Sequence, residues 1–169
     1  MEFTSLTNFT KKQRLELLSW IKCEHDLIMW SGNTFQSDFS VRTFSIHLKR
    51  DNLNPFAFLN SKNELIAYGE VVETRKTIAT ICRVIIRPDS RGHGIGYNFC
   101  HELISWIEKK KQFRWISLNT LRHNLAARKC YWKLGFQEMR NRSKVRFRNG
   151  NFYELIVMKR KTGRFGTSG

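Results

Sequence analysis

Acidic residues, prolines and long apolar runs are all scarce in this chain of 169 residues. Its 14 Asp and Glu face 30 Lys and Arg, and the formal net charge of +16 should attract anions such as nucleic acid, phosphates or acidic proteins. Apolar runs such as 155–158 last about four residues where a membrane span needs roughly 20, so no membrane partner is expected. With two prolines and no low-complexity segment, residues 1–169 are predicted to form a single domain, with 162–169 as a disordered tail.

Cysteine is also scarce. The chain has four cysteines without a C-x-x-C pair, too few for a disulfide framework. Residues 1–14 lack the apolar core of a signal peptide, so we expect a cytoplasmic protein. The Cys-His dipeptide at 100–101 and the Cys-Glu-His tripeptide at 23–25 have no partner pair at metal-ligand spacing, and no metal site is predicted.

The hydrophobic periodicity changes along the chain. Helical spacing predicts helices over 10–28, 41–48, 95–107 and 124–134. Apolar and alternating runs predict strands over 56–59, 65–72, 78–86, 115–118, 137–147 and 152–160. An antiparallel meander that feeds strand–helix units indicates an α+β fold with one mixed central sheet covered by helices.

A glycine-rich segment follows the strand that ends at residue 86. Gly92, Gly94 and Gly96 open a helix whose first amides are unpaired, and Arg91 adds a positive charge, so this segment suits a phosphate. The dinucleotide pattern G-x-G-x-x-G fails because Tyr97 stands at its last position, and no P-loop is present. The alternative is a tight turn with a helix cap.

A second motif covers residues 124–136. Asn124 can cap a short helix, on which Ala127 and Tyr131 share a face before the chain reaches Gly-Phe at 135–136. Residues 91–96 match [Q/R]-x-x-G-x-[G/A], and the second motif matches N-x-x-A-x-x-x-Y-x-x-x-G-F. In both, the chain resembles the GNAT acetyltransferase superfamily. The resemblance implies a mixed, mostly antiparallel sheet of about seven strands, flanked by about four helices.

The resemblance also implies acetyl-CoA as the acyl donor and a role for each matched residue. The strand that pairs with pantetheine ends in Val84, Ile85 and Ile86. The pyrophosphate would bind to the backbone amides of Arg91, Gly92, His93, Gly94, Ile95 and Gly96. Asn124 would contact the pantetheine arm, and Tyr131 would be the general acid that protonates the leaving thiolate.

The catalytic groups have structural alternatives. Tyrosine has an ordinary pKa near 10 and is protonated at neutral pH, as an acid must be, but Tyr131 could instead pack in the core. Ribosomal-protein N-terminal acetyltransferases carry a glutamate five residues before the asparagine, where this chain has Asn119, which speaks against that subfamily. Glu70 is the best remaining candidate for the base. Its alternative is a salt-bridged strand residue, with water as the base.

Two further segments concern the acceptor. Residues 30–35 lie where the superfamily builds the acceptor side of its cleft, so their aromatics line the pocket or simply pack. Cations occupy alternate positions along the predicted strand 137–147 and just beyond it, which puts them about 6.6 Å apart on one face. This face could bind RNA or an acidic partner, or it could simply be solvated. These cations are Arg140, Arg142, Lys144, Arg146 and Arg148.

The sequence therefore predicts an acetyltransferase that moves an acetyl group from acetyl-CoA to a primary amine of an unidentified acceptor. Direct transfer in a ternary complex is expected, since no cysteine has a recognisable nucleophile setting. The alternative is a protein of the same fold that binds acyl-CoA or RNA without efficient turnover.

Overall fold

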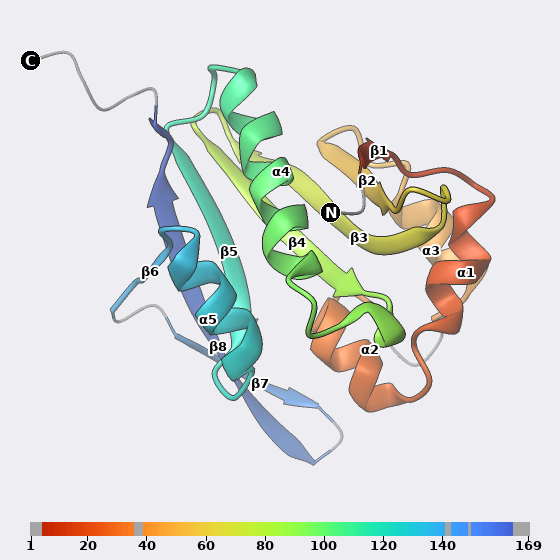
Figure 1. Cartoon of the computed structure of the whole chain (residues 1–169). Coiled ribbons are helices and arrows are strands. Elements are labelled where there is room, and N and C mark those ends of the chain that lie inside the picture. Colours follow the sequence, from red (N-terminus) through yellow and green to blue (C-terminus); the bar gives the residue numbers. More distant parts are fainter. Residues whose placement is uncertain (1–4, 36–38, 141–142, 149, 164–169) are drawn as a thin grey trace, which may run out of the picture.

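The computed structural model describes residues 5–35, 39–140, 143–148 and 150–163 (Figure 1). The helices are α1 (Gln13–Ser19), α2 (Glu24–Ser31), α3 (Val41–His47), α4 (Ile95–Lys109) and α5 (Leu125–Lys133). The strands are β1 (Ser5–Asn8), β2 (Leu53–Leu59), β3 (Leu65–Arg75), β4 (Ile78–Ile86), β5 (Trp115–Leu121), β6 (Gln137–Glu138), β7 (Lys144–Arg148) and β8 (Asn151–Lys161).

Over the described residues, these strands form one sheet in the order β1-β2-β3-β4-β5-β8-β6, and β7 also pairs with β8. The pairing of β4 with β5 is parallel and the other pairings are antiparallel. The predicted α+β fold with a mixed, mostly antiparallel sheet is confirmed.

The sheet has a hydrophobic core on each face. Phe56 and Phe58 of β2 belong to the core beneath α4 and α5, whereas Ala57 belongs to the core formed with α1, α2 and α3. This alternation is the period of two expected of a strand that is covered on both faces. Gly69 of β3 is required by close packing, because a Cβ atom there would lie 2.9 Å from the ring of Phe99 on α4.

Several predicted boundaries are wrong. The predicted helix 10–28 is two helices, and the turn between them is held by the amide of Lys22, which donates to Asp26 at 2.9 Å. The predicted strand 137–147 is also interrupted, since β6 ends at Glu138 and β7 begins at Lys144. Strand β1 was not predicted.

The predicted tail begins too early. Thr162 is buried, and its hydroxyl donates a hydrogen bond of 2.8 Å to the carbonyl of Phe113. The rest of that prediction, residues 164–169, lies outside the described residues. Among the helices that the structure describes, none has the length and apolar character needed to cross a bilayer.

Candidate active site

The strands β4 and β5 separate at the centre of the sheet (Figure 1). They pair from Ile78 to Ile81 along β4, and beyond this point β4 continues beside β3 alone. A cavity of about 1140 Å³ opens where they diverge. Most of its lining comes from residues 81–86 of β4, residues 119–121 of β5, and parts of α2, α4 and α5 with the loops before α4 and α5. Arg146 of β7 and Leu155 of β8 also line it.

The wall formed by β4 contains a bulge. Gly69 of β3 lies opposite two residues of β4, Arg83 and Val84, because the register shifts between the pairs Tyr68–Ile85 and Glu70–Cys82. Arg83 has a φ of 49°, in the left-handed region that a non-glycine residue seldom adopts. The indole Nε1 of Trp30 on α2 donates a hydrogen bond of 2.6 Å to the Arg83 carbonyl, which helps to hold this conformation.

The side chain of Arg83 is anchored by Glu70, which is fully buried. The guanidinium Nε of Arg83 donates to Glu70 Oε2 at 2.6 Å, and the Tyr68 hydroxyl donates to Oε1 at 2.6 Å. His47 Nε2 lies 3.0 Å from Oε2. Burial alone would raise the pKa of Glu70, but the hydrogen bonds from His47 and Arg83 and the Arg83 charge lower it below its ordinary value. Glu70 is therefore an ionised carboxylate with both oxygens occupied.

A second wall is the start of α4. Gly92 and Gly94 have φ values of 83° and 78°, and an added Cβ would meet nothing within 4 Å at either residue. The first helical hydrogen bond runs from the amide of Asn98 to the carbonyl of Gly94, so the preceding amides are left for a ligand. The guanidinium of Arg91 donates to the carbonyl of Ile86 at 3.1 Å and holds the loop against β4.

The third wall is α5. The Asn124 side chain caps the helix by accepting a 3.2 Å hydrogen bond from the amide of Ala127. Tyr131 lines the cavity, is 9% exposed, and packs edge-on against Phe136. Burial, with smaller contributions from the thiols of Cys100 and Cys130, raises the pKa of Tyr131 well above its ordinary value. The hydroxyl therefore keeps its proton at neutral pH.

The cavity brings together most of the residues singled out from the sequence. Its lining includes Val84, Ile85, Ile86, Arg91, Gly92, Gly94, Ile95, Gly96, Asn124 and Tyr131. His93 is exposed and outside this lining, and Glu70 lies beneath Arg83. In the segment 30–35, Trp30 lines the cavity and also packs against the buried ring of Phe35.

Sequence reasoning missed the anchoring cluster. His47, Tyr68 and Arg83 lie far apart in the sequence, and each of them is hydrogen-bonded to Glu70. A charged residue in each of two neighbouring apolar strands was the available signal. No group of three or more His, Cys, Asp or Glu suited to a metal occurs in the described part of the chain.

The predicted row of five cations is not continuous. Lys144, Arg146 and Arg148 are on β7, and Arg140 precedes it in the segment after β6. Arg142 lies outside the described residues. Arg146 lines the large cavity, whereas the sequence places it in a row of cations on one strand face.

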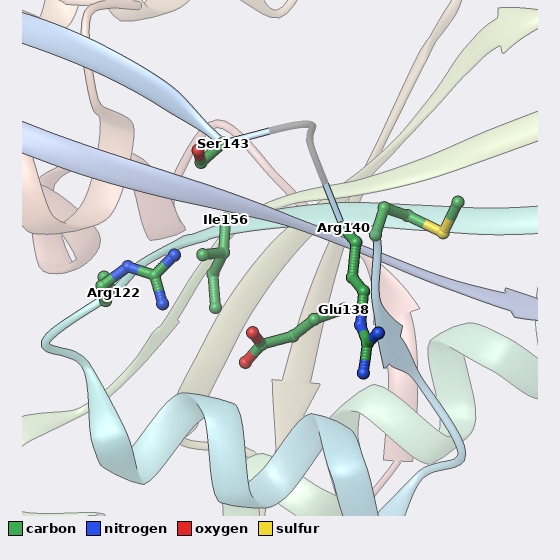
Figure 2. Close-up of a pocket in the computed structure, with 6 residues that line it drawn as sticks. Arg122, Glu138, Arg140, Ser143 and Ile156 are labelled. Carbon is green, nitrogen blue, oxygen red and sulfur yellow. The ribbon is translucent and has the colours of Figure 1, made fainter.

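A smaller cavity of about 340 Å³ lies beside β6 and β8 (Figure 2). Two of the three charged residues that line it are paired with residues outside the lining: Arg122 with Glu154 at 2.6 Å, and Glu138 with Arg128 at 2.8 Å. None of the predicted catalytic or cofactor-binding residues lines it.

Comparison with known proteins identifies the family of this chain. The profile of the acetyltransferase (GNAT) family matches residues 15–136. The chain therefore belongs to the GNAT family of acetyltransferases. No curated protein matches it by sequence.

Solved structures share its fold at low sequence identity. Spermidine N-acetyltransferase from Vibrio cholerae, in complex with CoA and spermine, is 16% identical with a TM-score of 0.80, over 97% of this chain and 98% of that one. A protein of Acinetobacter baylyi assigned as an acetyltransferase is also 16% identical, with a TM-score of 0.75 over 95% and 94%.

Proposed function

We propose that this protein transfers an acetyl group from acetyl-CoA to a primary amine, with Tyr131 as the general acid. One observation carries the proposal: a single cavity is lined both by the glycine-rich start of α4 and by the Tyr131 side chain. The first feature suits a phosphate, and the second supplies a proton within the same space.

The donor would bind along two walls. The amides of residues 91–96 and the Arg91 guanidinium take the pyrophosphate, because a helix start offers unpaired donors and a favourable dipole. The β4 edge from Cys82 to Ile86 is unpaired toward β5, so pantetheine amides can add to it as a strand would. Asn124 lines the same space. The CoA complex of the Vibrio cholerae enzyme supports this assignment.

The chemistry is direct transfer. The uncharged amine nitrogen bonds to the thioester carbonyl carbon, and the carbon–sulfur bond breaks. The sulfur takes a proton from the Tyr131 hydroxyl, and the nitrogen releases one proton to water as the amide forms. An amine that arrives as ammonium first loses its proton to water. Tyr131 regains its proton from solvent. No enzyme nucleophile is needed in this sequence.

The geometry of Glu70 supports a positioning role. Its oxygens are occupied by Tyr68, Arg83 and His47, and it does not line the cavity. By holding Arg83, Glu70 fixes the bulge of β4 against which the acetyl group would lie. The role of base predicted from the sequence needs an open path to the amine, so the positioning role is the one we propose.

The acceptor is a separate question. The Vibrio cholerae relatives are named for spermidine, a polycation. The cationic residues in the cavity lining of this chain are Arg83, Arg91, Lys129, Lys133 and Arg146. Among the described lining residues, the one carboxylate is that of Asp26. This balance of charge argues against a polyamine acceptor here.

A thiol-release assay tests the proposal. Each reaction contains the protein, acetyl-CoA and one amine from a series that differs in charge. Free CoA is measured with a thiol reagent. We expect amine-dependent release, with one acetylated amine for each thiol. Binding of acetyl-CoA without release for any amine would favour the alternative, a protein of this fold that binds acyl-CoA without turnover.

A further inference from the structure

The charged groups of the cavity are unevenly distributed. Asp26 lies in the first turn of α2, at the other end of the helix from Gly32. The hydrogen bond from the Lys22 amide and, more weakly, the charge of Arg91 in the loop before α4 lower the pKa of its carboxyl below the ordinary value. The carboxylate of the lining therefore belongs to the end assigned to the donor phosphates. The opposite end of α2 has cations instead.

That opposite end is formed by three segments. Gly32 ends α2, and an added Cβ there would lie 3.3 Å from an Nη atom of Arg146 on β7. The Arg83 guanidinium donates to the Thr34 hydroxyl at 3.2 Å. Gly32, Thr34, Arg83 and Arg146 all line the cavity. Two guanidinium groups thus reach the segment 32–34.

The two arginines differ in their partners. Arg83 is neutralised by its ion pair with the buried Glu70. Arg146 is partly exposed, and none of the ion pairs found among the described residues includes it. A guanidinium presents a planar fork of donors that matches a carboxylate or a phosphate. Arg146 is therefore the cation available to a ligand at this end.

We propose that the acceptor is a primary amine that also carries an oxyanion, a carboxylate or a phosphate, and that Arg146 binds this anion. The inference rests on the proposed function, because it takes the end of the cavity away from the α4 loop as the acceptor end. A second ammonium group at this position would meet uncompensated positive charge, so a diamine is a poor acceptor.

Amines of matched length provide the test. The wild-type protein is assayed with acetyl-CoA and, in turn, 4-aminobutanoate, butylamine, 1,4-diaminobutane and 3-aminopropyl phosphate. We expect kcat/KM to be at least tenfold higher for an anionic amine than for butylamine, about 1.4 kcal/mol, and lowest for the diamine. The carboxylate and the phosphate arms show which oxyanion is preferred.

Substitutions assign the preference to Arg146. In Arg146→Gln, the anion-to-butylamine ratio of kcat/KM should fall at least fivefold, and Arg146→Lys should retain part of it. Lys76→Gln removes the same charge from the exposed β3–β4 turn and should leave the ratio unchanged. Arg146 also lies near the C-terminal end of α2, where a cation stabilises the helix through its dipole. Thermal stability is therefore measured for each variant, so that a loss of stability can be told from a loss of anion binding.

Two results would overturn the inference: a wild-type preference for 1,4-diaminobutane, or a ratio that Arg146→Gln leaves unchanged. If no amine is acetylated, the proposed function fails instead. Calorimetry on the CoA-saturated protein then decides the inference by itself, because 4-aminobutanoate should bind more tightly than 1,4-diaminobutane, and equal or reversed affinities would contradict it.

Discussion

The indole nitrogen of Trp30 donates a hydrogen bond of 2.6 Å to the carbonyl oxygen of Arg83. This bond joins the C-terminal half of α2 to the bulge of β4, and both residues line the large cavity. The Arg83 side chain is held separately by Glu70. Backbone and side chain of the bulge are thus fixed by different elements, which gives the β4 edge a defined position beside the space that we propose for the acetyl group.

The first prediction concerns this bond. Trp30→Phe keeps an aromatic ring beside Phe35 but removes the donor, so the free energy of unfolding should fall by about 1 kcal/mol. The looser bulge should lower kcat several-fold, because small misplacements of reacting groups are costly. Denaturant unfolding and steady-state kinetics measure both effects. Trp106→Phe, on α4 against Phe56 and outside the cavity lining, is the matched control and should leave kcat unchanged. An unchanged kcat in Trp30→Phe would mean that the bond serves folding alone.

The second prediction concerns the acid. Tyr131→Phe keeps the ring packed against Phe136 and removes the hydroxyl, so thermal stability should barely change while turnover falls roughly 100-fold. The affinity for acetyl-CoA, measured by calorimetry, is the control and should stay close to that of the wild type. Intact turnover would make Tyr131 a packing residue.

The third prediction separates charge from bulk at the α4 helix start. An added Cβ at Gly96 would meet Ile86 at an ordinary 3.7 Å, so substitutions there should fold. Gly96→Asp should weaken acetyl-CoA binding at least tenfold more than the isosteric Gly96→Asn, about 1.4 kcal/mol, because its carboxylate repels the pyrophosphate. Calorimetry gives both constants. Equal affinities for the two variants would argue against phosphate binding at this helix start.

The fourth prediction concerns Glu70 and pH. Glu70→Gln leaves Arg83 buried without its counter-charge, which should cost about 3–5 kcal/mol of unfolding free energy at pH 6. Because the pKa of Glu70 is lower in the folded than in the unfolded state, its stabilisation is complete above pH 4.5 and is lost as pH falls through the folded value. The difference between wild type and variant should therefore shrink toward pH 3.

Activity separates the two roles of Glu70. As a positioning residue, Glu70 should change kcat in the Gln variant without moving the acidic limb of the pH–rate profile. A flattened acidic limb, measured where the variant is still folded, would instead identify Glu70 as the base.

The sequence predicted the fold better than its connections. The apolar strands and the two motifs contain local signals, so β3, β4, α4 and α5 lie close to their predicted ranges. The break between α1 and α2 is held by the hydrogen bond from the Lys22 amide to Asp26, which hydrophobic periodicity does not register. The predicted strand is interrupted after Glu138 although its residues alternate. β1 was missed because its four residues pair with β2 without strong alternation of their own.

Some residues of the site are likewise marked by local motifs, and others are brought together only by long-range contacts. Gly94 and Tyr131 belong to motifs of fixed spacing, and the structure brings them to one cavity. The contact of Arg146 with α2 joins residues more than a hundred positions apart, and the Glu70 cluster joins β3, β4 and α3. Periodicity along the chain contains no information on such contacts, so the sequence alone places Arg146 in a row of cations on one strand face.

Acetyl transfer in the cavity between β4 and α5, with Tyr131 as the acid, can be measured directly. The most direct test is mass spectrometry of the products after incubation of the wild-type protein and Tyr131→Phe with isotopically labelled acetyl-CoA and 4-aminobutanoate or butylamine. We expect one labelled acetyl group on the amine for each CoA released by the wild type, and roughly 1% of that rate in the variant. CoA bound by both proteins with no acetylated amine from either, or equal rates from both, would contradict this expectation.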